Sequence, residues 1–176
     1  MKNIHLKIFA VLVLLVVGTT SCGVYSFNNT SIPSNVKTVN LSLFGNKARY
    51  VNATLAPNLT DAVRQLINNQ TKLTLTEDIN ADYVLSGDVS SYDVSTSGIS
   101  SGSSSTTSSA SMNRLTVGFH LVWIDNTKEG KKKEFNVSQN FDFASSLSLD
   151  QAESQLKSDI LKNVSEAIFN DVFANW

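Results

Sequence analysis

The strongest constraint on the fold is a pair of long segments in which hydrophobic and polar residues alternate. In residues 112–124 every second residue from Leu115 to Trp123 is apolar, and residues 135–143 continue the same period from Phe135 to Phe143. A period of two is typical of a half-buried strand, so each segment predicts a strand. The connection 125–134 contains Gly130 near its middle. We therefore expect an antiparallel hairpin.

Apolar residues at steps of three and four predict two helices, one over residues 54–70 and one from Ser148 towards the end of the chain. Thr54 is the expected cap of the first helix, and Ser148 with Gln151 fits a capping box for the second. Further strands are expected at 36–44, 73–76 and 82–94. This order predicts an α+β, two-layer sandwich with two helices packed on one face of a four- to five-stranded mixed sheet.

The amino-terminal segment has the pattern of a secretory signal peptide. Lys2 and Lys7 precede a run of ten apolar residues, 8–17, which is about half of what a membrane-spanning helix needs. The chain's single cysteine, Cys22, comes after this run and four small or polar residues, 18–21. Cys22 and these residues resemble a lipobox, although Thr19 stands where that motif has leucine. We expect residues 1–21 to be a lipoprotein signal, 22–35 a lipidated cysteine and tether, and 36–176 one domain. An unmodified cysteine near an ordinary cleavage site is the alternative.

Charge and motifs argue against several functional classes. The chain has 14 basic and 15 acidic residues, and removing Lys2 and Lys7 leaves 12 against 15, so nucleic acid is not expected as a partner.

The serine-rich tract 95–111 predicts a mobile loop, and its match to GxSxG at 98–102 lacks the strand and helix of a nucleophile elbow. His120 stands alone after signal removal. We expect no catalytic residue, no metal and no cofactor.

Basic residues gather at the predicted hairpin turn, and Arg114 follows the serine-rich tract. Two interpretations remain open: a solvated turn, or a site for an anionic group such as a lipid-headgroup phosphate. The cluster consists of Lys128, Lys131, Lys132 and Lys133.

The terminal helix carries an apolar stripe wider than one packed face requires. Leu161, Phe169 and Phe173 lie beside the stripe assigned to the core. They predict either a wider core contact or a partner face made by Phe169, Phe173 and Trp176.

Several short motifs resemble the LptE family of lipopolysaccharide-assembly lipoproteins in its Bacteroidetes form. They are Cys22-Gly-Val-Tyr-Ser-Phe27, Ser31-Ile-Pro33, Val36-Lys-Thr-Val39, Leu59-Thr-Asp-Ala62, Leu85-Ser-Gly87, Asn113-Arg-Leu-Thr-Val117 and Ala174-Asn-Trp176. The resemblance implies a non-enzymatic lipoprotein on the periplasmic side of the outer membrane. It also implies a plug in the LptD barrel that helps lipopolysaccharide reach the outer leaflet. Family members contact lipopolysaccharide through basic residues, for which Arg114 and the four lysines are the candidates here.

A different class of function is the alternative. The same sandwich would serve a periplasm-facing lipoprotein that acts alone as a lipid or small-ligand carrier or as a scaffold. A carrier requires an apolar cavity, whereas a barrel plug requires a largely polar surface.

Overall fold

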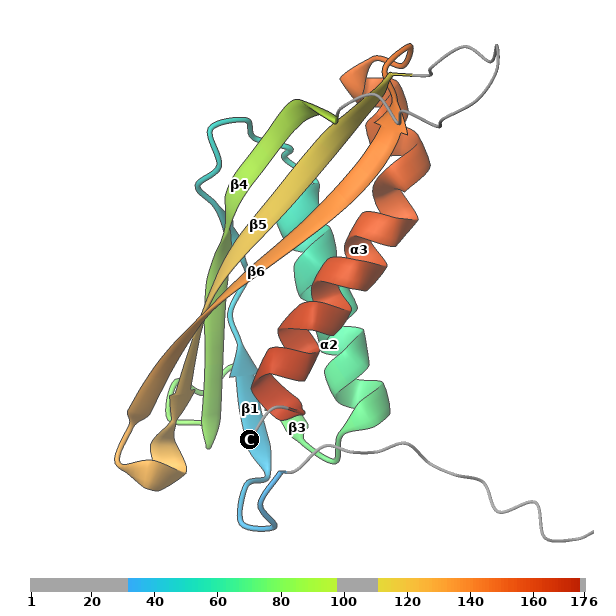
Figure 1. The fold of residues 1–176 in the computed structure, drawn as a ribbon. Helices are drawn as coiled ribbons and strands as arrows, with labels where there is room; N and C mark the ends of the chain where they lie inside the picture. The colour runs from blue at the N-terminus through green and yellow to red at the C-terminus, as the bar shows by residue number, and fades with distance from the viewer. Residues whose placement is uncertain (1–31, 98–110, 175–176) are drawn as a thin grey trace, which may run out of the picture.

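The computed structural model describes residues 32–97 and 111–174. Within them, two helices lie side by side on one face of a mixed, six-stranded sheet (Figure 1). This arrangement confirms the predicted α+β sandwich, and the two-residue strand β2, which was not predicted, brings the sheet to six strands. The elements in chain order are β1 (Thr38–Leu41), β2 (Gly45–Asn46), α2 (Leu55–Gln70), β3 (Thr74–Thr76), β4 (Tyr83–Ser97), β5 (Met112–Asp125), the 3₁₀ turn η1 (Asn126–Lys128), β6 (Lys131–Ala144) and α3 (Leu149–Phe173).

The sheet has a parallel half and an antiparallel half. Its strand order is β3-β1-β4-β5-β6, with the short β2 also pairing with β4. Strand β1 is parallel to both β3 and β4, and helix α2 forms the crossover between β1 and β3 that a parallel pair needs. The predicted hairpin is β5–β6, paired without interruption from Asp125–Lys131 to Met112–Ala144.

The core lies between the sheet and the helices. The apolar residues of β5 that alternate from Leu115 to Trp123 are buried, as the period of two predicts. Trp123 packs edge-on against Tyr83, with ring centroids 5.1 Å apart, and burial raises the pKa of Tyr83 to about 12. From α3, Val164, Ile168 and Val172 close the core.

The helix starts follow the predicted chemistry in one case and depart from it in the other. Ser148 and Gln151 form the complete capping box of α3. Thr54 is the N-cap residue of α2, but its side chain does not cap the helix. Its backbone N–H and its hydroxyl instead donate to the side-chain oxygen of Asn52, at 3.1 and 3.0 Å. The cap position was therefore predicted and its bonding was not.

A carboxylate that sequence patterns did not indicate fixes the start of β1. Asp82 Oδ2 accepts hydrogen bonds from the backbone N–H groups of Lys37 and Thr38, at 2.7 and 2.9 Å, and from the Thr38 hydroxyl at 3.0 Å. The backbone donors of Lys37 and Thr38 hold the pKa of Asp82 below its ordinary value. The residue that leads into β4 thus anchors the strand beside it.

The ends of the long strands differ from the predicted ends. Strand β4 continues through Ser97, so residues 95–97 of the serine-rich tract are strand rather than loop. The GxSxG match at 98–102 lies outside the described residues. Strand β6 begins at Lys131, and the turn is confined to residues 126–130, where Glu129 and Gly130 adopt positive φ of 55° and 71°. The three consecutive lysines therefore belong to a strand rather than to a turn.

Candidate functional site

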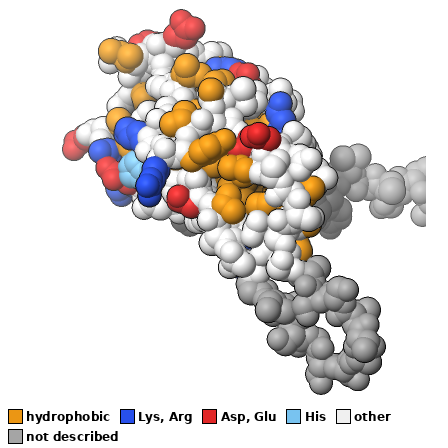
Figure 2. All heavy atoms as spheres, turned by 90° about the horizontal axis from the view of Figure 1, so that it is seen from above, with side chains coloured by type: hydrophobic (Ala, Val, Ile, Leu, Met, Phe, Trp, Pro, Cys, Tyr) orange, Lys and Arg blue, Asp and Glu red, His pale blue; other side chains and the backbone are white. Residues whose placement is uncertain are grey.

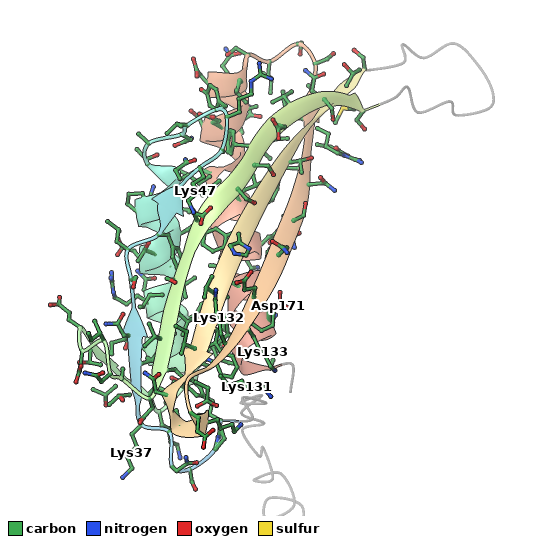
Figure 3. The ribbon with its side chains drawn as sticks, turned by 90° about the vertical axis from the view of Figure 1, so that its left-hand side faces the viewer. Lys37, Lys47, Lys131, Lys132, Lys133 and Asp171 are labelled. Carbon is green, nitrogen blue, oxygen red and sulfur yellow. The ribbon has the colours of Figure 1, made fainter. Side chains whose placement is uncertain are left out.

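The start of β6 separates the three consecutive lysines. Successive side chains of a strand point to opposite faces. Lys133 lies on the helix-covered face, with its Nζ 5.4 Å from the centroid of the Trp123 ring. Lys132 lies on the uncovered face, where its Nζ is 2.7 Å from Glu134 Oε1 and holds the pKa of that carboxylate below its ordinary value. Figure 3 shows Lys131, Lys132 and Lys133 together at one end of the sheet.

The fourth lysine belongs to the turn itself. Asp125 is fully buried, and its Oδ1 accepts from the backbone N–H and the hydroxyl of Thr127, at 3.0 and 2.6 Å. Lys128 Nζ lies 3.5 Å from Asp125 Oδ2. This lysine thus compensates a buried carboxylate, which is a structural task in addition to any binding role.

Arg114 does not join the lysines. It lies near the other end of β5, eleven residues before Asp125, which is about 37 Å at roughly 3.4 Å per residue. Its guanidinium makes a bidentate ion pair with Asp142 of β6, at 2.7 and 2.9 Å. The pair raises the pKa of Arg114 and lowers that of Asp142. A single phosphate site formed by Arg114 and the lysines is therefore not what the fold provides.

The uncovered face of β5 and β6 is instead a ladder of polar cross-strand pairs. Thr116 donates a hydrogen bond to Asn140 Oδ1 at 2.8 Å. His120 Nδ1 lies 3.0 Å from Asn136 Oδ1, and its Nε2 lies 3.6 Å from Glu134 Oε2. His120 is thus a strand histidine on the uncovered face of the sheet. The hairpin register sets these residues opposite each other. The alternation of both strands had already indicated that they share one face of the sheet.

The structure places the predicted partner-face rings in the core. Phe169 and Phe173 are 3% and 0% exposed, with ring centroids 4.9 Å apart. The terminal helix lies over both β6 and α2 and so buries a wider stripe than one contact would need. Of the two interpretations, the wider core contact is the one that the structure shows. Trp176 and Cys22 lie outside the described residues.

A tyrosine pair lies at the other end of the molecule, and one of its members, Tyr92, lines a small cavity. Tyr92 donates a hydrogen bond to Glu153 Oε1 at 2.9 Å, and burial followed by this bond raises the pKa of Tyr92. Tyr50 stacks on Tyr92 at 5.6 Å. The cavity of about 170 Å³ is lined by both polar and apolar side chains, Glu153 and Leu161 among them. Figure 2 looks onto this end and shows hydrophobic side chains gathered over it.

These surfaces define a class of protein. The described residues contain no group of His, Cys, Asp and Glu side chains that would hold a metal ion. No helix in the described part of the chain is both long and apolar enough to cross a bilayer. What the fold offers is a polar sheet face on a two-layer α+β scaffold, and this scaffold is the structural class to which the described residues belong.

Comparison with known families agrees with that class. The family model LptE, described as lipopolysaccharide-assembly, matches residues 36–172. The match covers well over half of the chain, so this chain belongs to the LptE family. A search of curated proteins found no match.

Solved structures are similar to this chain at low sequence identity, and the first of the three below has a TM-score above 0.5. A putative neuraminyllactose-binding hemagglutinin homolog from Helicobacter pylori matches with a TM-score of 0.54 and 12% identity, over 81% of this chain and 86% of that one. A minor lipoprotein from Acinetobacter baumannii has a TM-score of 0.48 and 15% identity, over 77% and 91% of the two chains. Rare lipoprotein B from Shewanella oneidensis has a TM-score of 0.46 and 13% identity, over 77% and 93%.

Proposed function

We propose that this chain is a non-enzymatic outer-membrane lipoprotein, held on the periplasmic side through Cys22, which partners an LptD-type barrel as a plug during lipopolysaccharide assembly. The match of the LptE family over residues 36–172 carries the proposal. The family match supports a role in lipopolysaccharide assembly. The barrel partner, the outer-membrane location and the lipid anchor at Cys22 are proposed here in addition to that role.

The uncovered sheet face supports the role of a plug. The interior of a large outer-membrane barrel is polar and holds water. The side chains that β6 directs to its uncovered face are all polar from Lys132 to Asp142, and Asn136, Ser138 and Asn140 are exposed among them. Such a surface needs no apolar partner to cover it, so it suits a lumen lined with water and polar groups.

The alternative of a solitary carrier has less support. Sites for small ligands usually enclose about 300–1,000 Å³. The cavity beside Tyr92 encloses about 170 Å³ and is bordered by Glu153 and Lys157. It is too small and too polar for a lipid chain, so we favour the plug.

Copurification tests the proposal. An affinity-tagged full-length chain, extracted in detergent from outer membranes, should bring down a large barrel of the LptD type, identified by mass spectrometry. The Cys22→Ala variant should remain a longer precursor that takes up no labelled palmitate. Recovery of the tagged chain from the outer membrane without any barrel would refute the plug, and undiminished palmitate labelling of Cys22→Ala would refute the anchor.

The lysines at the start of β6 are proposed contacts for lipopolysaccharide phosphates. Replacing Lys131, Lys132 and Lys133 together with Ser should weaken binding to purified lipopolysaccharide by about tenfold. The loss should be larger at low salt than at high salt, because salt screens exposed charges. Arg114→Ser is the matched control, since it removes a cation at the far end of the same hairpin. Equal binding by the triple variant and the parent chain would mean that these lysines only keep the strand soluble.

A further inference from the structure

Strand β6 forms one edge of the sheet along its whole length. Within residues 32–97 and 111–174, it pairs with β5 alone, and the strand order ends with it. In an antiparallel pair, alternate residues turn their N–H and C=O groups towards the neighbouring strand, and those between turn theirs away. An edge of this kind is a template on which a further strand can pair.

This edge is protected by charge near its two ends and not along its middle. Edges are commonly blunted by proline, by a bulge, by short length or by charges along the strand. Strand β6 has 14 residues, no proline and no shift of register against β5, whereas the β4–β5 pair shifts at Val89/Ser91. The charged residues of the strand lie at 131–134 and at Asp142, and the segment 135–141 between them carries no charge. Helix α3 runs alongside β6 and packs against it (Figure 1).

The charges near the two ends of β6 are complementary to each other. Lys132 lies near the start of the strand and Asp142 near its end, both on the uncovered face. In an antiparallel pair of two copies, the start of β6 in one copy lies opposite the end of β6 in the other. We propose that β6 is the docking edge for a second copy of this chain, in an antiparallel β6–β6 pair centred on Val137.

The centre at Val137 follows from the pairing of charges. It places Lys132 opposite Asp142 of the second copy, twice by symmetry, and Asn136 opposite Ser138. Each new ion pair joins two existing ones, because Lys132 already contacts Glu134 and Asp142 already contacts Arg114. Charges linked in this way gain more than isolated surface pairs do.

Neighbouring registers are less favourable. A centre at Ser138 would set Glu134 opposite Asp142, and like charges directly opposite each other destabilise a strand pair. A centre at Asn136 would place Lys132 opposite Asn140 and lose both ion pairs. The inference does not depend on the barrel or on the lipid anchor, because it rests only on this strand.

Disulfide trapping tests the register. The variants Asn136→Cys and Ser138→Cys of the full-length chain each carry one cysteine besides Cys22. Reconstituted in phospholipid vesicles and mixed in equal amounts, they should form a cross-linked dimer under mild oxidation. Each variant alone should give at least tenfold less, since a position two residues out of register exceeds disulfide reach. The parent chain, whose one cysteine is Cys22, gives the background. A mixture that cross-links no better than the parent overturns the proposal.

Charge repulsion tests the same edge without cysteine chemistry. The double variant Asn136→Lys with Ser138→Lys sets lysine opposite lysine at the centre, and should weaken dimerisation about tenfold in analytical ultracentrifugation in detergent. Ser90→Lys with Ser95→Lys adds the same charge at exposed positions of β4, and should leave dimerisation unchanged. Circular dichroism checks that both variants fold. A parent chain that remains monomeric at the highest concentration overturns self-pairing, and so does equal weakening by the two variants.

Discussion

Phe173→Ser should unfold the domain rather than remove a contact with a partner. The Phe173 ring is fully buried and packs against Phe169. Truncating a buried phenylalanine costs about 3–5 kcal/mol. The serine hydroxyl adds the cost of a buried polar group, roughly 1–3 kcal/mol. The sum approaches the whole stability of an ordinary domain, about 5–15 kcal/mol, so thermal unfolding followed by circular dichroism should show a lost or much lower transition.

Leu43→Ser is the matched control, because Leu43 is 71% exposed and its loss should change the stability by no more than about 0.5 kcal/mol. The comparison also decides between the two interpretations of the terminal helix. A Phe173→Ser chain that folds normally but no longer copurifies with the barrel would restore the partner face and contradict the buried position of the ring.

Gly87→Ala should cost far more than its single methyl group suggests. A Cβ atom at Gly87 would lie 2.6 Å from the backbone oxygen of His120 and 2.6 Å from Cε1 of the Phe119 ring. The backbone of β5 cannot move away without breaking its pairing with β4, and overpacking of this kind costs typically about 1–3 kcal/mol or more. We expect a clear fall in the midpoint of urea unfolding.

Gly45→Ala provides the comparison within the same sheet. A Cβ atom there would meet Asp88 Cβ at 3.5 Å, which is an ordinary contact. Its stability should stay within about 0.5 kcal/mol of the parent chain. If both alanine variants unfold at the same urea concentration, close packing of β4 on β5 is not the reason for glycine at position 87. Gly87 belongs to the Leu85-Ser-Gly87 motif, one of those by which the chain resembles the family. The close packing of β4 on β5 supplies a physical reason for the glycine in that motif.

Local patterns in the sequence determined the main elements of this protein. The alternation in residues 112–124 and 135–143 predicted the two long strands and their hairpin, because a period of two is set by the strand backbone itself. Ser148 and Gln151 predicted the start of α3, since a capping box is made by residues three apart in the chain. The order of elements then led to the two-layer sandwich.

Only the tertiary structure decided which residues share a surface. Lys131, Lys132 and Lys133 are adjacent in sequence, yet β6 divides them between two faces, and the length of β5 separates them from Arg114. Asp82 reaches β1 across 44 residues of chain to bond Thr38, and no local pattern encodes such a contact. Phe169 is buried because α3 packs on both β6 and α2. Periodicity reports which face of an element is apolar, whereas the residues that meet across elements depend on how distant segments pack together.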